Sequence, residues 1–328
     1  MATTLVAGRR RRSQLVLRNT MVGWSFLLPN LVGFAVLTLV PIALIFYYAF
    51  TNWNVFGGAT WSGLDNFRQL IHDDSFYTAL WNTLYYSIVH IPLTLAVSLG
   101  LALLLNRKLR GVAFFRTVAF FPYITSIVAI ATVWNILFSP NTGPVNEILR
   151  DIGVAHPPGW TQSTDWSMPA IIIMGTWREM GYYMLLFLAG LQTIPQDLYE
   201  AAKVDGTNAW QRFRAVTLPG LRSTMFFVLV VLTIGSLKIF DLIIVTTQGG
   251  PGQSTLVLSQ YIYQQSFQEN HWGYASMISI VLFGVCVLAT IALFLVNKWW
   301  DGVRRLLAWC WRGFVFAFIP NPWRARWI

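Results

Sequence analysis

A polar interval at 195–219, between two long apolar segments, contains the residues whose types and spacing point most clearly to a task. Pro195 opens it, two acidic residues follow in the first turn, and Asp205 with Gly206 closes its first half. A proline start and a glycine stop predict a short helix of about two turns. A second helical run follows, and we expect Pro219 to end it. Two short helices joined by a tight turn would form a rigid docking element, which a soluble partner protein can bind and move as one body.

Four ionisable residues lie inside the apolar segments: Arg178, Glu179, Lys238 and Asp241. A charge within hydrocarbon costs about 2.5–3.5 kcal/mol on insertion scales, so such residues usually face a bundle interior or a watery cavity. Lys238 and Asp241 are three positions apart, so we expect them to neutralise each other on one helix face. Arg178 and Glu179 are adjacent, so we expect them to point in different directions and to pair elsewhere. Both a structural ion-pair network and the lining of a solute pathway are consistent with these positions.

Aromatic residues flank these charges. Aromatic faces combined with a few hydrogen-bonding groups suit a sugar, whose rings offer apolar C–H faces and hydroxyl rims. For any single aromatic residue, lipid-facing or interfacial packing is the ordinary alternative. The candidate residues of a solute pathway are Trp177, Arg178, Glu179, Tyr182, Tyr183, Lys238, Phe240 and Asp241.

The composition indicates a membrane protein: 55% of the residues are hydrophobic and 11% are charged, whereas a soluble domain carries about 25% charged residues. The net charge of +10 could suggest nucleic acid, but the basic residues lie in clusters between apolar runs, so we expect no nucleic-acid partner. Cys286, Cys310 and the scattered histidines give neither a disulfide framework nor a metal site. The sequence has no phosphate-binding loop of the Gly-x4-Gly-Lys-Ser/Thr type and no enzyme constellation. If ATP drives this protein, another chain binds it.

Six apolar runs are long enough to cross a bilayer core of about 30 Å, which predicts an all-α integral membrane fold. The first resembles the start of a secretory signal but is too long, so we interpret it as an uncleaved span. An even number of spans places both termini on the same side. The runs are about 21–50, 79–105, 113–138, 168–191, 223–246 and 274–298.

The distribution of Lys and Arg predicts the orientation. Nineteen of the 23 lie at 1–20, 106–116, 193–222 and 298–328, whereas the alternate loops hold only Arg68 and Arg150. Cytoplasmic loops carry the excess of Lys and Arg, so both termini and the polar interval should face the cytoplasm. Among the external loops, 51–78 contains a short amphipathic pattern, 139–167 contains four prolines and should be irregular, and 247–273 begins with a tight turn followed by an amphipathic run.

The chain divides by sequence into three parts: a basic cytoplasmic N-terminus at 1–20, a six-span domain at 21–300 that includes the polar interval at 195–220, and a tail at 301–328. The tail is rich in Trp and Arg, which is typical of an interfacial helix on the inner leaflet. A docking surface for a partner is the alternative.

One motif in the polar interval resembles a family signature. Glu200-Ala201-Ala202, then Gly206, then Leu218-Pro219 follow the spacing of the EAA signature of ATP-binding-cassette (ABC) importer permeases. Val216 stands where isoleucine is usual. The segments 187–192 and 249–251 resemble the oligosaccharide-importing branch of that family, similar to maltose, trehalose and glycerol-phosphate importers. The resemblance covers roughly residues 20–300.

This resemblance implies a type I, MetI-like permease of the bacterial inner membrane, which imports a di- or oligosaccharide by alternating access. It implies a second, homologous permease subunit, two ATP-binding subunits that use ATP and Mg, and an extracytoplasmic solute-binding protein, in addition to membrane lipid. The chain itself should bind no cofactor or metal and should not be an enzyme. The residues implied to contact the ATPase are Tyr199, Glu200, Ala201, Ala202, Asp205, Gly206, Leu218 and Pro219.

Three alternatives remain. A glycerol-3-phosphate or other polyol-phosphate importer of the same family would need a net positive cavity, whereas Glu179 and Asp241 offset Arg178 and Lys238. A secondary transporter or channel would need no ATPase. A membrane-bound enzyme would need a reactive cluster, which the sequence does not show.

Overall fold

The computed structural model describes residues 20–54, 57–107 and 110–318. The chain forms two compact units, which we describe separately. The first comprises Met1–His72 with Gln265–Ile280, and the second comprises Asp73–Gln264 with Val281–Ile328. Helices dominate both units, as the sequence predicts.

The first unit begins with a helix over Thr20–Tyr48. Within this helix, the π-helical turn η1 (Ala35–Leu39) precedes α2 (Val40–Tyr48), and Pro41 lies in the first turn of α2. A short antiparallel hairpin follows, formed by β1 (Thr51–Asn54) and β2 (Gly58–Trp61), and then α3 (Asp65–Ile71). The buried Asn66 amide fixes the hairpin by donating to the carbonyl oxygens of Ala49 (2.8 Å) and Thr51 (2.9 Å).

The hairpin was not predicted by the all-α assignment, although its signal is present. Thr51 and Trp53 are strong strand formers, and the glycines at 57 and 58 provide a tight turn. The amphipathic pattern at 64–71 does form a helix, α3, as predicted.

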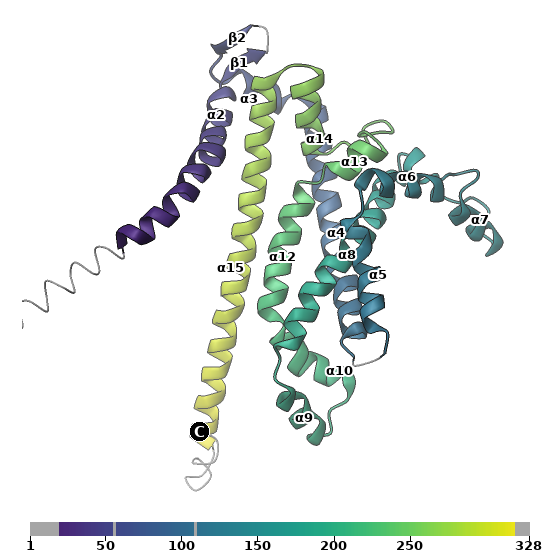
Figure 1. The fold of residues 1–328 in the computed structure, drawn as a ribbon, viewed down its shortest axis with the longest axis vertical. Coiled ribbons are helices and arrows are strands. Elements are labelled where there is room, and N and C mark those ends of the chain that lie inside the picture. Colours follow the sequence, from purple (N-terminus) through teal and green to yellow (C-terminus); the bar gives the residue numbers. More distant parts are fainter. Residues whose placement is uncertain (1–19, 55–56, 108–109, 319–328) are drawn as a thin grey trace, which may run out of the picture. The chain divides into compact units, whose positions relative to one another are not determined.

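The core of the second unit is built around α8 (Ser167–Gln192). This helix packs against α4 (Asp74–Leu105), α5 (Val112–Ile124) and α12 (Arg222–Leu237), which lie side by side in Figure 1. Met184, Phe187 and Leu232 are fully buried in this core. Gly181 makes the approach of α8 to α5 possible, because a Cβ atom there would overlap the carbonyl group of Ala119.

Two of the expected spans are broken. The segment 113–138 bends by 100° between α5 and α6 (Ile127–Leu137), where Thr125 is extended after Pro122. The segment 223–246 is interrupted after Leu237, and a separate helix, α13 (Asp241–Thr246), packs on α6. Both segments are apolar on average despite Pro122, Lys238 and Asp241, so mean hydropathy alone does not show either break.

The loops predicted to be external contain more helix than we expected. The proline-rich interval 139–167 should be irregular, but it contains α7 (Pro144–Asp151) and the 3₁₀ turn η2 (Trp160–Gln162). Pro144 occupies the first turn of α7, where proline is well tolerated. Asn146 fixes the loop by accepting a 2.6 Å bond from the Trp160 indole. The amphipathic run predicted after the 247–252 turn forms α14 (Leu258–Tyr263), followed by the π-helical turn η4 (Gln264–Gln268).

By length and composition, three of the described helices can cross a membrane: Thr20–Tyr48, Asp74–Leu105 and Trp272–Lys298. The number is five if each of two bent helix pairs counts as one span. The helix α8 has 26 residues and is about 39 Å long. The count of six spans stays a prediction.

The last helix, α15 (Trp272–Phe318), continues beyond the predicted end of the final span. The first part of the Trp- and Arg-rich tail is therefore helical and continuous with that span. Its predicted position on the inner leaflet stays a prediction, and residues 319–328 lie outside the described part of the chain.

Candidate functional site: a polar cavity and the loop at 195–220

The first half of the loop is the short helix that the sequence predicts. The helix α9 (Gln196–Val204) begins after Pro195 and ends at Gly206, whose φ is +72°. The amide of Gly206 donates to the Lys203 carbonyl (3.0 Å) and the amide of Thr207 to the Ala202 carbonyl (3.2 Å). A left-handed residue at this position satisfies the last carbonyl groups of a helix, and glycine adopts it without steric cost.

The second half is the second helical run that the sequence predicts. The helix α10 (Ala209–Arg212) starts with a capping box between Asn208 and Gln211. It continues through the π-helical turn η3 (Phe213–Thr217) into α11 (Leu218–Gly220), and the chain then bends by 69° into α12. The run ends at Gly220, one residue after Pro219, so the predicted end is confirmed to within one residue.

Hydrogen bonds join the two halves of the loop. The Tyr199 hydroxyl lies 3.0 Å from the Thr217 hydroxyl, and the Arg212 guanidinium donates to the Thr207 carbonyl. Ala202 is buried between the halves. The loop is therefore internally fixed without help from another chain.

The remaining motif residues form an exposed surface, because Glu200, Ala201, Asp205, Leu218 and Pro219 are all exposed. Three large apolar residues that the sequence analysis did not select are exposed on the same loop: Leu198, Val204 (89%) and Trp210 (68%). The sequence does contain a signal for these three residues, because apolar residues within an otherwise polar segment indicate an interaction surface.

The second site is a polar cavity of about 160 Å³ at the break after α12. It brings together all four ionisable residues that the sequence places inside the apolar segments, two from α8 and two from the break, and Phe240 lines it as well. The other lining residues are Tyr86, Ile127, Gly175, Gly235, Ser236, Ile239 and Leu242.

The charges are arranged differently from our expectation. Lys238 and Asp241 do not share a helix face, because α12 ends at Leu237 and α13 begins at Asp241. Arg178 and Glu179 do not diverge: the Arg178 Nη1 lies 3.9 Å from the Glu179 Oε1, and both residues line the cavity. The expectation for Lys238 and Asp241 assumed one unbroken helix through both residues, which the structure does not have.

The three aromatic candidates on α8 do not line this cavity. Trp177 packs edge-on against Trp134, with ring centroids 5.6 Å apart. Tyr182 stacks on Tyr123 at 4.5 Å, and Tyr183 is buried in the core. These three aromatic residues thus pack against other side chains of the second unit, and their role in a solute pathway stays a prediction.

The sequence analysis missed a buried polar group beside the cavity. The Nδ1 of His90 on α4 lies 2.9 Å from the Ser236 hydroxyl on α12, and its Nε2 lies 3.9 Å from the Glu179 carboxylate. The Tyr86 ring stacks on the His90 ring at 4.7 Å. These contacts connect three helices at the wall of the cavity.

A sequence signal for this group exists on α4. Polar residues recur there at spacings of three and four, which places them on one face of a helix. All are buried: Thr83, Ser87, His90, Thr94 and Ser98. A polar stripe on an otherwise apolar helix indicates a face turned towards other helices.

The structure combines long apolar helices, a polar cavity at a broken helix and an exposed loop with a fixed internal geometry. These are features expected of a subunit of a membrane transporter. Residues 93–302 match the family model described as binding-protein-dependent transport system inner membrane component. The chain belongs to this family, and the matched region includes the loop and every lining residue of the cavity except Tyr86.

Curated relatives agree over nearly the whole chain. It is 34% identical to the probable ABC transporter permease protein YesP of Bacillus subtilis, over 90% of this chain and 96% of the relative. It is 37% identical to the lactose transport system permease protein LacF of Rhizobium radiobacter, over 86% of this chain and 94% of the relative.

A solved structure confirms the fold. A bacterial ABC transporter involved in the import of the acidic polysaccharide alginate matches with a TM-score of 0.76 at 26% identity, covering 88% of this chain and 98% of that one. A bacterial alginate ABC transporter in complex with alginate pentasaccharide-bound periplasmic protein matches with a TM-score of 0.74 at 26% identity, covering 84% of this chain and 94% of that one. The resemblance to type I ABC importer permeases, drawn from the EAA signature, is confirmed.

Proposed function

We propose that this chain moves a di- or oligosaccharide into the bacterial cytoplasm by alternating access, driven by separate ATPase subunits that use ATP and Mg. One observation carries the mechanism: α12 connects the two sites. It begins at Arg222, directly after the loop, and ends at Leu237, beside the cavity. Its 16 residues correspond to a rod of about 24 Å.

In this mechanism, closure of the ATPases moves the loop at 195–220 as one body. Its internal bonds, such as that between Tyr199 and Thr217, keep it from absorbing the motion. Movement then passes along α12 to Ser236, which is bonded to His90 of α4. The cavity, which α4, α8 and the break share, opens to one side of the membrane at a time.

A neutral sugar is the solute that the charges of the cavity favour. Two cations and two carboxylates line it, so its formal charge is balanced. Hydrogen-bonding groups of both kinds, with Phe240 beside them, suit hydroxyl rims and apolar ring faces. Relatives named for lactose, diacetylchitobiose and arabinooligosaccharide transport are consistent with this choice.

The complete transporter would contain this chain, a different homologous permease, two ATP-binding subunits and an extracytoplasmic solute-binding protein. Both termini and the loop at 195–220 would face the cytoplasm. The solved complex of the alginate transporter with its periplasmic protein supports a delivering partner.

An acidic sugar or a polyol phosphate is the second candidate, because the similar solved transporter imports an acidic polysaccharide. Binding of neutral and anionic oligosaccharides and of glycerol 3-phosphate to the cognate extracytoplasmic protein separates the two. Preference for an anionic solute would contradict the neutral-sugar assignment.

Uptake into reconstituted vesicles tests the mechanism. The complex should accumulate the sugar only with ATP and with its ATPase subunits present. Gly206→Asp or Glu200→Lys should leave the chain inserted but abolish ATP-driven uptake. Uptake without the ATPase would instead support a secondary transporter or channel.

A further inference from the structure

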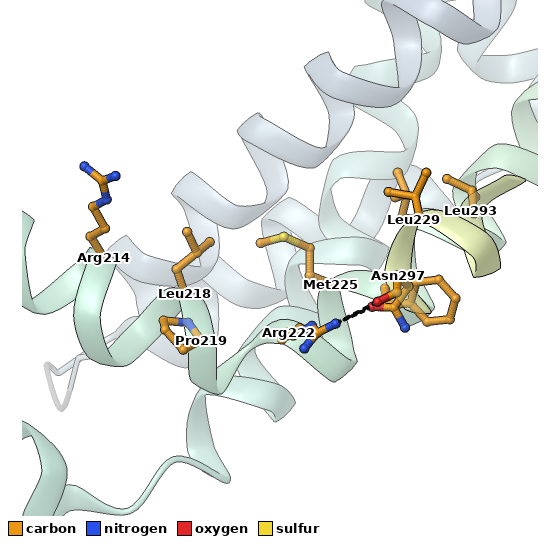
Figure 2. A pocket seen from close by; sticks show the side chains of 10 residues that line it. Arg214, Leu218, Pro219, Arg222, Met225, Leu229, Leu293 and Asn297 are labelled. Carbon is orange, nitrogen blue, oxygen red and sulfur yellow. Dashed lines mark hydrogen bonds between the residues drawn. The ribbon is translucent and has the colours of Figure 1, made fainter. Parts of the chain in front are cut away.

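An open groove runs between the junction of α11 with α12 and the 293–297 part of α15. Its volume is about 570 Å³, within the range of about 300–1,000 Å³ typical of ligand sites. Figure 2 shows its lining, with the side chains of Arg214 and Leu293 at opposite ends of the view. Ten residues line it: Arg214, Leu218, Pro219, Arg222, Met225, Phe226, Leu229, Leu293, Val296 and Asn297.

Polar and apolar groups are ordered along the groove. At one level, the Arg222 guanidinium donates to the Asn297 backbone and side-chain oxygens, at 3.1 and 2.9 Å (Figure 2). Further along both helices, Phe226 packs edge-on against Phe294 at 4.9 Å. The helices α12 and α15 run antiparallel here, so Arg222 and Asn297 lie at the same end of the groove. Leu229 and Leu293 form its apolar walls, and Leu229 lies about 10 Å from Arg222 along α12.

The polar end is cationic. Arg214 and Arg222 keep their charge at any physiological pH, and none of the ten lining residues is acidic. The predicted orientation, on which this inference depends, places this end at the inner leaflet. A groove with a positive end and an apolar body matches an amphiphile with a negative head.

We propose that the groove binds an anionic phospholipid of the inner leaflet. Its phosphate would lie at Arg214 and Arg222, and one acyl chain would run between Met225, Leu229 and Leu293. Basic pockets between helices on the cytoplasmic side of a membrane are suited to anionic headgroups. A helix of a second permease subunit fits less well, because it would have to supply an acidic residue at the depth of the two arginines.

The position of the groove gives the lipid a regulatory role. Leu218 and Pro219 belong to the loop at 195–220, and Leu293 belongs to the last span. A lipid between them would contact both the moving loop and a fixed helix. We therefore expect ATP-driven uptake by the intact complex to depend on anionic lipid.

The experiment uses the whole transporter reconstituted in phosphatidylglycerol and phosphatidylcholine mixtures. Native mass spectrometry counts the lipids that stay bound after extraction. The wild type should retain phosphatidylglycerol in preference to phosphatidylcholine. Arg214→Gln should reduce this retention by about fivefold, the factor expected for one basic contact with an anionic lipid. Leu293→Trp, which fills the groove, should abolish it.

Matched controls are Arg110→Gln, an exposed arginine of another predicted cytoplasmic segment, and Leu295→Trp, an exposed leucine of α15 outside the groove. Both should retain lipid as the wild type does. Arg214 forms no hydrogen bond or ion pair within the described part of the chain, so its variant should fold even if Leu293→Trp does not assemble. Absence of retained phosphatidylglycerol, equal retention in all variants, or a crosslink from Leu293→Cys to the second permease would overturn the proposal.

Discussion

Gly206 shows how one residue shapes the exposed loop. Its φ of +72° ends α9, and a Cβ atom there would meet nothing within 4 Å. Gly206→Ala therefore adds strain without a clash, at a cost of about 1–2 kcal/mol. We expect ATP-driven uptake to fall while membrane insertion is unchanged, measured as transport and protein yield in vesicles.

Gly58 is the matched control, because its φ is +70° and it also has open space around it, but it lies in the β1–β2 hairpin. Gly58→Ala should carry the same strain and keep ATP-driven uptake. Equal losses in both variants would mean that general instability, not the loop, explains the effect.

The cavity charges give a second prediction at this scale. Glu179→Gln leaves the cavity with a net positive charge and removes the carboxylate 3.9 Å from both Arg178 and His90. Loss of a charged contact of about 1.4 kcal/mol corresponds to about tenfold. We expect uptake of a neutral sugar to fall about tenfold, measured as initial rates against solute concentration.

Asp165→Asn removes an exposed carboxylate from the loop at 139–167 and serves as the control. It should transport at the wild-type rate. Normal transport by Glu179→Gln would exclude this side chain from the pathway and favour a purely structural ion pair.

At the level of helices, close packing of α8 on α5 depends on Gly181. A side chain there must displace the α5 backbone, since Ala119 and Phe120 backbone atoms occupy its place. Over-packing of this kind costs about 1–3 kcal/mol or more. Gly181→Leu should therefore lower the yield of assembled complex, measured by gel filtration and by the temperature of aggregation.

Gly284 on α15 provides the comparison, because a Cβ atom there would meet nothing within 4 Å. Gly284→Leu should assemble normally. The difference between the two variants isolates the helix–helix contact from the general effect of replacing a glycine in a membrane helix.

The elements also show how far the sequence could be used for prediction. Local signals were sufficient for α9, where Pro195 and Gly206 mark the ends, and for α3 and α14, where an amphipathic pattern marks a face. Hydropathy identified the apolar segments but not their breaks. The bend after Ile124 follows Pro122, and the break after Leu237 contains Lys238 and ends at Asp241, and mean hydropathy does not register these single residues.

The cavity was predicted in part for the same reason. The cost of burying charge selected Arg178, Glu179, Lys238 and Asp241, and the structure brings these together. Their mutual geometry could not be predicted, because it depends on the break. His90 was missed because each histidine was judged alone rather than with the polar stripe of α4.

For the whole molecule, orientation is the property to test. With Cys286 and Cys310 replaced by Ala, single cysteines can report sidedness. Val204→Cys on α9 should react only with reagents inside the cell, and Ile152→Cys after α7 only with impermeant reagents outside. Both positions are well exposed, at 89% and 72%. The reverse labelling would contradict the predicted cytoplasmic position of the loop and with it the contact with an ATPase.

The π-helical turn η3 has a consequence for the motif spacing. It holds one residue more than an ordinary turn between α10 and α11. Each residue of an α-helix advances the direction of the chain by about 100°. Deleting Ala215 would convert the turn into a regular one and leave the Glu200 surface at nearly the same angle around the axis, because the π turn takes up its extra residue locally. Deleting a residue while the π turn is kept would instead rotate that surface by roughly a quarter circle relative to α12. The number of residues between Gly206 and Pro219, together with the kind of turn that they form, therefore sets the direction in which the loop presents its surface.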